Sequence, residues 1–507
     1  MFGYAIANVL LGALLASAAS IDLHPRSTIT DCLTAGGVGT VLSPGQSGFS
    51  TAALPFNRRF TFTPAAIAYP TSAQQVANIV KCGASLGVSV TARSGGHSYA
   101  AYGLGGENNH LVVDLSKMKT MTMSADSQGN VNVVVQTGNR LGELAQFLWN
   151  NGQRVLPHGT CPYVGVGGHT SYGGFGLYGR KAGLLLDRAI AAQVVLANGT
   201  IITASTTSSP DLFFALRGAA PSYGIVTAWT YKTDPAPTSL INYQINFPNA
   251  KTNMTHSVQI LEAFQAFAVT NPDPNLSALL PIGYVDSSHL NMIIFGTYYG
   301  TTTQFNTAIA PLKVALASIS PTVVVQPPAN WFVGTTYQTG PWSVTAPEPS
   351  DTFFAKSLTV DSALTSTLDY TGWVKWLMAN AGSSSTSLGW FVQADMYGGY
   401  ISTIPSTATA YAARSDVLNF QFYGSSGSKA FPTTGTGLKN GITFMNTMVS
   451  TLQKNVVHAY PNYIDPTLTQ AQWTSEYFGS NMPQLIATKK KWDPTNVFRF
   501  PQSIPTA

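Results

Sequence analysis

The chain has 507 residues, of which 45% are hydrophobic and only 9% are charged. This length exceeds one ordinary core and predicts two domains, and the composition excludes extensive disorder. The net charge of +5 is spread along the chain without a basic stripe interleaved with aromatic residues, which argues against a nucleic-acid partner.

The N-terminus, MFGYAIANVLLGALLASAAS, is an apolar run that ends in small residues. The pattern predicts a secretory signal peptide at residues 1–19, cleaved near Ala18 or Ala19, although no Lys or Arg precedes the apolar run. A membrane anchor is the alternative, but the run is short for a span of about 20 residues. We therefore expect a secreted, extracellular protein with no membrane association.

Residues 66–120 alternate short apolar strands with one helix. The helix SAQQVANIVKCGASLG places Val76, Ile79 and Val80 on one face and ends at Gly87. With the strands on either side, it predicts a β-α-β unit.

A further strand, VNVVVQ, leads into a helix that starts near Leu141. After a glycine-rich segment, IAAQVVLANGTIITAS predicts two strands joined by Asn198-Gly199, a strong hairpin pattern. DLFFALRGA then predicts a helix and YGIVTAWTYKT a strand.

From about residue 237 aromatic residues, Asn, Thr and Ser become more frequent. Strand candidates such as NMIIFGTYYG and SLGWFVQADMYGG alternate with helical stretches such as SVQILEAFQAFAV, which predicts an antiparallel sheet with helices on one face. The fold class is therefore α+β. Near the C-terminus, MPQLIATKKKW predicts a helix, and we interpret Lys489, Lys490 and Lys491 as its solvated face.

Three Asn-x-Ser/Thr sequences, at Asn198, Asn253 and Asn275, fit N-glycosylation of a secreted protein. Asn198 lies in the predicted hairpin turn, where we expect poor accessibility.

The three cysteines are an odd number for a secreted protein. Cys32 and Cys82 lie in the same N-terminal region and are candidates for a disulfide, which leaves Cys161 over. From composition alone, an inert buried thiol and a functional thiol are both open for Cys161.

Two glycine-rich segments are candidates for chemistry. In Arg93-Ser-Gly-Gly-His97-Ser-Tyr99, consecutive glycines after a strand favour an anion nest that suits a pyrophosphate, although a plain turn has the same pattern. The second, Gly159-Thr-Cys-Pro-Tyr-Val-Gly-Val-Gly-Gly-His169, superficially resembles a dinucleotide fingerprint. We reject that interpretation because no long amphipathic helix follows.

A metal site is the other interpretation of this second segment. His158, Cys161 and His169 match no common zinc spacing, so we expect no metal.

Together, GGHSY and the later GTCP-x-VGVGGH resemble the FAD domain of the vanillyl-alcohol oxidase and p-cresol methylhydroxylase superfamily. Within it they resemble the berberine-bridge-like FAD-linked oxidases, whose flavin is bound through both a His and a Cys. The resemblance implies that His97 holds the flavin 8α-methyl and Cys161 the flavin C6, which accounts for the odd cysteine.

The same resemblance implies further contacts with FAD, from both glycine-rich segments and from later positions. The implied residues are Ser94, Gly95, Gly96, Ser98, Gly165, Gly167, Gly168, Ile225, Tyr477 and Asn481.

The C-terminal sequence Tyr460-Pro-Asn-Tyr463-Ile-Asp465 resembles the closing segment of this group, which returns to the flavin. By its residue type alone, Tyr463 would be a packed aromatic. The resemblance makes it the residue that takes the substrate hydroxyl proton.

The strand Trp390-Phe-Val-Gln393-Ala-Asp395 places Phe391, Gln393 and Asp395 on one face, and an Asp on an otherwise apolar strand is costly unless partnered. A plain surface position is the alternative. In the fungal glucooligosaccharide-oxidase branch, a Gln-x-Asp lines the site and the Asp pairs with the catalytic Tyr. The resemblance thus makes Tyr463 and Asp395 catalytic. The substrate-binding residues that it implies are Tyr99, Phe391, Gln393, Gln421 and Tyr460.

The resemblance divides the chain after the signal peptide. It implies a p-cresol-methylhydroxylase-type FAD-binding domain over residues 20–236, completed by the segment 456–507, and a substrate domain over residues 237–455.

The expected protein is a monomeric oxidase that converts the C1 hydroxyl of a reducing oligosaccharide to the lactone and reduces O2 to H2O2. The alternatives are an oxidase of a secondary metabolite or alcohol, and a non-catalytic carbohydrate-binding protein. Which oligosaccharide is preferred is open at this point.

Overall fold

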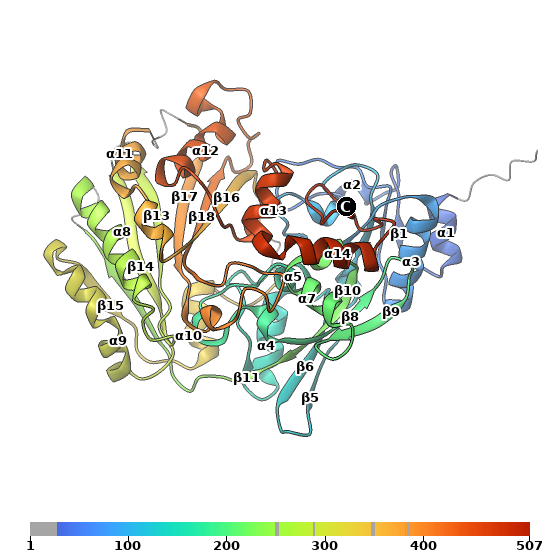
Figure 1. Ribbon diagram of the computed structural model, residues 1–507, viewed down its shortest axis with the longest axis horizontal. Coiled ribbons are helices and arrows are strands. Elements are labelled where there is room, and N and C mark those ends of the chain that lie inside the picture. The colour runs from blue at the N-terminus through green and yellow to red at the C-terminus, as the bar shows by residue number, and fades with distance from the viewer. Residues whose placement is uncertain (1–27, 249–252, 287–288, 346–349, 381, 383–385) are drawn as a thin grey trace, which may run out of the picture.

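The computed structural model describes residues 28–248, 253–286, 289–345, 350–380, 382 and 386–507. The predicted signal peptide lies outside these residues. Two lobes lie side by side (Figure 1). The N-terminal lobe carries a four-stranded and a five-stranded sheet, and the other, which we call the seven-stranded lobe, is built on one large sheet.

The predicted β-α-β unit forms the four-stranded sheet, in which β2, β4 and β3 run parallel. Helix α3 begins after Ser72, whose hydroxyl accepts from the Gln75 N–H, and ends at Gly87 with a φ of 70°. The elements of this unit are α1 (Ile29–Ala35), β1 (Val41–Leu42), α2 (Phe49–Ala52), β2 (Ala66–Ala68), α3 (Ala73–Leu86), β3 (Val90–Arg93) and β4 (Leu111–Asp114).

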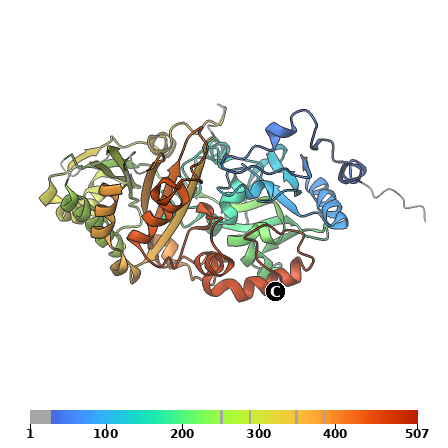
Figure 2. The same cartoon turned by 90° about the horizontal axis from the view of Figure 1, so that it is seen from above.

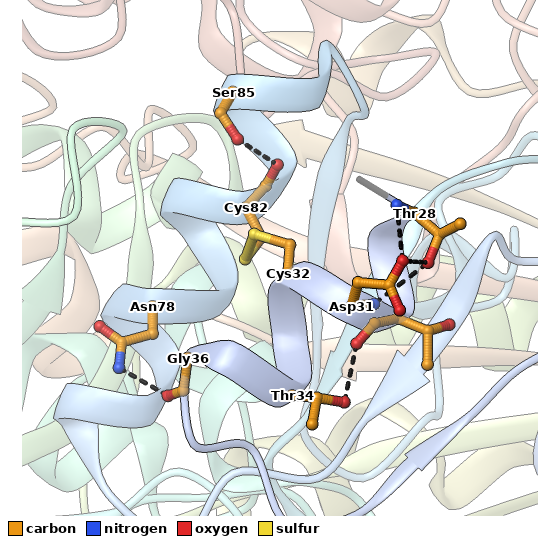
Figure 3. Close-up of a disulfide and its surroundings, with 9 residues drawn as sticks. Thr28, Asp31, Cys32, Thr34, Gly36, Asn78, Cys82 and Ser85 are labelled. Carbon is orange, nitrogen blue, oxygen red and sulfur yellow. Dashed lines mark hydrogen bonds between the residues drawn. A yellow bond between two sulfur atoms is a disulfide. The ribbon is translucent and has the colours of Figure 1, made fainter. Parts of the chain in front are cut away.

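A disulfide joins α1 to α3 (Figure 3). It links Cys32 and Cys82, whose Cα atoms are 5.9 Å apart. Beside it, the Asn78 amide donates to the carbonyl of Gly36 at the end of α1, at 2.8 Å. The predicted pairing is confirmed, and Cys161 is the cysteine outside it.

The five-stranded sheet is antiparallel, in the order β5-β6-β10-β8-β9. The predicted hairpin is present, because β8 and β9 pair across Asn198-Gly199 and Gly199 has a φ of 77°. The elements are β5 (Met121–Ala125), β6 (Val131–Gln136), α4 (Leu141–Asn150), β8 (Ala189–Val195), β9 (Ile201–Ser205), α7 (Pro210–Ala219) and β10 (Ile225–Lys232). A separate short pair, β7 (Arg154–Val155) with β11 (Asp234–Pro235), lies beside it.

The seven-stranded sheet has the order β15-β12-β14-β13-β17-β18-β16, and every neighbouring pair is antiparallel. Four helices pack on one face of it and bury the larger core of the chain. This confirms the predicted α+β class. The strands are β12 (Ile241–Asn246), β13 (Leu279–Asp286), β14 (His289–Tyr298), β15 (Thr322–Val325), β16 (Phe353–Asp361), β17 (Gly389–Met396) and β18 (Asp416–Ser425). The helices are α8 (Met254–Val269), α9 (Thr302–Ala315), α11 (Tyr370–Asn380) and α12 (Gly441–Leu452).

The chain then returns to the N-terminal lobe. Helices α13 (Gln470–Phe478) and α14 (Met482–Trp492), red in Figures 1 and 2, lie against that lobe. This return supports the division after residues 236 and 455, which we keep as a proposal. Within the described residues, no helix has the length and apolar character needed to cross a membrane.

The prediction that Lys489 lies on a solvated face is wrong. Its side chain is 0% exposed, and its ammonium donates to Asp493 at 2.7 Å and to the carbonyl of Ser222 at 2.6 Å. Asp493 also accepts backbone N–H groups of Val497 and Phe498. The lysine is buried because these charge-assisted hydrogen bonds replace its hydration.

Lys490 and Lys491 are exposed, as predicted. The buried pair of Lys489 and Asp493 predicts a large effect on stability. We expect Lys489→Ala to lower the free energy of unfolding by about 3–5 kcal/mol, because it leaves the buried Asp493 carboxylate without its cation. Lys490→Ala is the matched control and should change it by less than about 0.5 kcal/mol. Urea titration of both variants measures the difference, and equal effects would contradict the buried pair.

Candidate active site

A cavity of about 460 Å³ lies where the two lobes meet. Both predicted glycine-rich segments line it, together with one face of the seven-stranded sheet and the segment 460–464. A volume of this size is typical of small-molecule sites. The predicted residues on its wall are Ser94, Gly95, Gly96, His97, Ser98, Tyr99, Cys161, Gly165, Gly167, Gly168, Gln393, Asp395, Gln421, Tyr460 and Tyr463.

The two glycine-rich segments touch through their backbones. A Cβ on Gly95 would lie 2.3 Å from the Gly165 nitrogen, and a Cβ on Gly165 would lie 2.0 Å from the Gly95 nitrogen. Ser94 reinforces the contact, since its hydroxyl donates to the carbonyl of Thr137 and accepts from the Gly167 N–H. Only glycine permits this approach, which brings the segments of His97 and Cys161 to one cavity.

The His97 ring lies against Phe56, with centroids 4.3 Å apart and planes 20° from parallel. Cys161 is exposed on the opposite glycine-rich segment. The short helix α5 (Val166–Ser171) follows it, so the long helix of a dinucleotide fingerprint is absent at this place.

His169 on α5 is a neutral acceptor. Its Nε2 accepts from the Gly159 N–H at 2.9 Å, and burial with the nearby His158 and His97 lowers the pKa of His169 to about 3. Among the described residues, no group of three His, Cys, Asp or Glu side chains is placed to hold a metal ion.

The carboxylate of Asp395 lies on the cavity side of β17. It is 2% exposed and accepts from the Gln393 amide at 2.8 Å and from the Asn419 amide at 3.3 Å. Burial raises the pKa of Asp395 to about 7, although both amides oppose the rise. The predicted common face of Gln393 and Asp395 follows from the strand register.

Tyr463 stands between two other tyrosines. Its ring stacks on Tyr99 with centroids 5.9 Å apart and meets Tyr460 edge-on at 4.9 Å. Burial and the nearby Asp395 raise the pKa of Tyr463 well above its ordinary value. The phenol is therefore neutral near neutral pH and can pass on its proton only as it gains another.

Tyr460 is almost fully buried, and its hydroxyl is directed at the N-terminal lobe. The phenol oxygen accepts from the N–H groups of Gly174 at 3.0 Å and Phe175 at 2.9 Å, and from the Asn462 amide at 3.0 Å. Tyr460 thus ties the C-terminal segment to the turn that follows α5.

Family models match two parts of the chain. The model of an FAD binding domain matches residues 64–205, and the model described as berberine and berberine like matches residues 459–505. The xylooligosaccharide oxidase of Thermothelomyces thermophilus is 35% identical over 503 residues, which cover 97% of each chain. The chitooligosaccharide oxidase of Gibberella zeae is 35% identical over 489 residues and 94% of each chain.

The chain belongs to the berberine-bridge-like family of FAD-linked oxidases.

A solved structure of a related oxidase has the same fold as this chain. The glucooligosaccharide oxidase of Acremonium strictum, described with a 6-S-cysteinyl, 8α-N1-histidyl FAD, has a TM-score of 0.84 at 31% identity. The match covers 95% of this chain and 99% of that one. The family's cofactor also fits the cavity here, because a Cβ on the lining residue Gly168 would meet no atom within 4 Å and both His97 and Cys161 line the same wall.

Three residues predicted to contact FAD lie away from the cavity wall. Ile225 is buried in β10, while its neighbours Gly224 and Val226 line the cavity. The Tyr477 hydroxyl accepts from the Asp465 N–H, and the Asn481 amide donates to carbonyls of the segment 406–410. All three side chains take part in packing around the C-terminal segment, and their contact with FAD stays a prediction.

Phe391 is also off the cavity wall. It is 37% exposed and stacks on Tyr423 farther along the same sheet face, with centroids 5.0 Å apart. Gln421 lies nearer and donates to the Tyr99 hydroxyl at 2.8 Å.

Sequence reasoning missed Phe56, Asn57 and Asn419. Asn57 is fully buried, and its amide group bonds the Tyr99 carbonyl and both backbone groups of Phe353. An asparagine in a loop has many plain explanations, so only the fold reveals this junction.

The hydroxyl groups of Tyr460 and Tyr463 should contribute differently to the free energy of unfolding. Tyr460→Phe should lower the free energy of unfolding by about 1–3 kcal/mol, because it strips buried N–H donors of their acceptor. Tyr463→Phe should leave stability unchanged within about 0.5 kcal/mol, since no hydrogen bond of its hydroxyl is found among the described residues. Urea denaturation of the two variants tests this, and a reversed order would refute the assignment of the Tyr460 hydroxyl.

Proposed function

We propose that the chain oxidises the C1 hydroxyl of reducing oligosaccharides to the lactone and reduces O2 to H2O2, with FAD linked through His97 and Cys161. The observation that carries the proposal is that one cavity joins these two residues with Tyr463 and Asp395. A lactone product opens in water to the aldonic acid.

His97 and Cys161 would hold the flavin at two positions, so that its ring system is fixed before substrate arrives. When bound, FAD would supply the acceptor for the C1 hydride and the electrons that reduce O2. The remaining contacts that we propose for it come from the two glycine-rich segments that line the cavity.

Tyr463 and Asp395 handle the proton. The Tyr463 phenol is neutral, so it takes the C1 hydroxyl proton only if its own proton moves away at the same time. Asp395 is the acceptor, because it is the carboxylate on the wall whose charge already acts on Tyr463. No external base is required for this step.

The sugar would bind along the sheet face beyond the flavin. Gln393 and Gln421 present amides to the cavity, and Tyr99 holds Gln421 in place. Farther out, Phe391 stacks on Tyr423 on one side and faces Gly283, which has no side chain, on the other. An exposed aromatic beside open space suits a second sugar ring, which favours an oligosaccharide over a single sugar.

We also propose secretion of the protein. The disulfide between Cys32 and Cys82 suits an oxidising compartment, and the predicted signal peptide at residues 1–19 provides the route. Of the predicted glycosylation sites, Asn198 is exposed at the hairpin, contrary to our expectation of poor access. The Asn275 side chain is already bonded to Lys181 and Asp273.

The covalent links are tested by acid denaturation of the purified protein. Yellow flavin should stay with the polypeptide in the wild type, in His97→Ala and in Cys161→Ala, because each single variant keeps one link. It should leave only the double variant. Flavin that washes out of the wild type would overturn the bicovalent assignment.

The pH dependence of flavin reduction tests Asp395. Because only the deprotonated carboxylate can accept a proton, the rate of reduction by an oligosaccharide should rise with pH through about 7 and then level off. Asp395→Asn should lower the rate by about 10²–10⁴-fold and remove this rise, which we call the acid limb of the pH profile. Stopped-flow absorbance of the flavin measures both.

Peroxide release distinguishes the substrate class. We expect H2O2 with reducing oligosaccharides and none with the same sugars reduced to alditols, which lack the C1 hemiacetal. Activity on alcohols alone would favour the secondary-metabolite alternative, and a colourless protein would favour a binding protein.

A further inference from the structure

Asn419 lies directly behind the proposed proton acceptor. It faces Asp395 across the paired strands β18 and β17, and its amide donates to Asp395 Oδ2 at 3.3 Å. The side chain is 0% exposed and is not part of the cavity wall. It therefore cannot touch substrate, and any effect on the reaction must pass through Asp395.

Among the residues that the structure describes, only the N–H side of the Asn419 amide has a hydrogen-bond partner. Its Oδ1 is buried and has no hydrogen-bond partner among the described residues. A buried acceptor left unpaired is destabilising, so an apolar side chain of the same size would serve the core better. Retaining the amide at this position is explained by what its N–H group does for Asp395.

Two amides hold the carboxylate. The Gln393 amide donates to Oδ1 at 2.8 Å, and Asn419 donates to Oδ2 from the other strand. No Lys, Arg or His forms an ion pair with Asp395 in the described part of the chain, and the titratable groups that face it are the phenols of Tyr463 and Tyr460. The charged form of Asp395 thus depends on the two amides.

We propose that Asn419 is a positioning residue that keeps Asp395 ionised and correctly oriented to receive the Tyr463 proton. The proposal rests on the function proposed above. In that step the Tyr463 O–H bond breaks and an Asp395 O–H bond forms, while the phenol oxygen takes the hydroxyl proton of the substrate. Asn419 gains and loses no proton, and its N–H bond stabilises the carboxylate before the transfer.

Gln393 and Asn419 have different roles in this arrangement. Gln393 lines the cavity, so its removal changes substrate contacts and Asp395 together. Removal of Asn419 changes Asp395 alone. The role of Asn419 therefore predicts a change in the pH profile of the reduction rate with an unchanged KM.

The test compares wild type with Asn419→Leu and Asn419→Asp, two variants of similar size. Loss of the N–H donor should move the acid limb of flavin reduction upward by about one pH unit, which is about a tenfold lower rate below the limb. The Asp variant should move it farther, because it adds a second carboxyl beside the first. Asn242→Leu, a buried asparagine of β12 in the same sheet, is the control and should leave the limb in place.

A second measurement does not depend on turnover. Infrared titration follows the carbonyl band of the protonated Asp395 carboxyl, with Asp395→Asn as the blank. The band should persist to higher pH in Asn419→Leu than in the wild type.

The proposal would be overturned if wild type and Asn419→Leu showed the same pH dependence of the flavin reduction rate and the same infrared titration of the Asp395 carboxyl. This holds even if the variant unfolds more easily. If Asn419→Leu does not fold, the Asp variant decides in the same way. A wild type that oxidises no oligosaccharide would instead overturn the proposed function, while the infrared titration still reports on Asn419.

Discussion

The backbone contact between Gly95 and Gly165 is the constraint on which the site depends. One turn follows a strand of the four-stranded sheet, and the other precedes α5 beside the five-stranded sheet. Because no Cβ separates them, His97 and Cys161 reach the same cavity from two sheets. An alanine at either glycine would push the turns apart by more than side-chain rearrangement could absorb, since the neighbouring atoms are backbone.

The opposite wall of the cavity belongs to another lobe, so its geometry requires a rigid junction. Arg180, almost fully buried, donates to the carbonyls of Leu276, Pro272 and Tyr397 across that junction. Arg414 adds two hydrogen bonds of 2.8 Å to Asp187. Bidentate and multiply bonded guanidinium groups fix orientation as well as distance. The sheet face that carries Asp395 is thereby held against the glycine turns.

Local pattern was sufficient for much of this architecture. The alternation in Trp390-Phe-Val-Gln393-Ala-Asp395 predicted the shared face, and Gly87 and Asn198-Gly199 predicted a helix end and a hairpin turn. The wrong prediction for Lys489 and the missed role of Asn419 both depend on contacts between residues that are distant in sequence. Lys489 is buried because Ser222 and Phe498 supply carbonyls to it, and Asn419 meets Asp395 only through strand pairing. Neither relation leaves a trace in the spacing of nearby residues.

The placement of the cysteines bears on how the chain matures under oxidising conditions. The native bridge closes a loop with a sequence separation of 50, and pairings with Cys161 would close longer ones. Loop-closure entropy grows only logarithmically, by about 0.6 kcal/mol for each doubling, so chain length alone hardly disfavours the wrong bridges. Selection of the native bridge must come from docking of α1 on α3. A thioether to flavin at the exposed Cys161 would then withdraw the competing thiol from disulfide exchange.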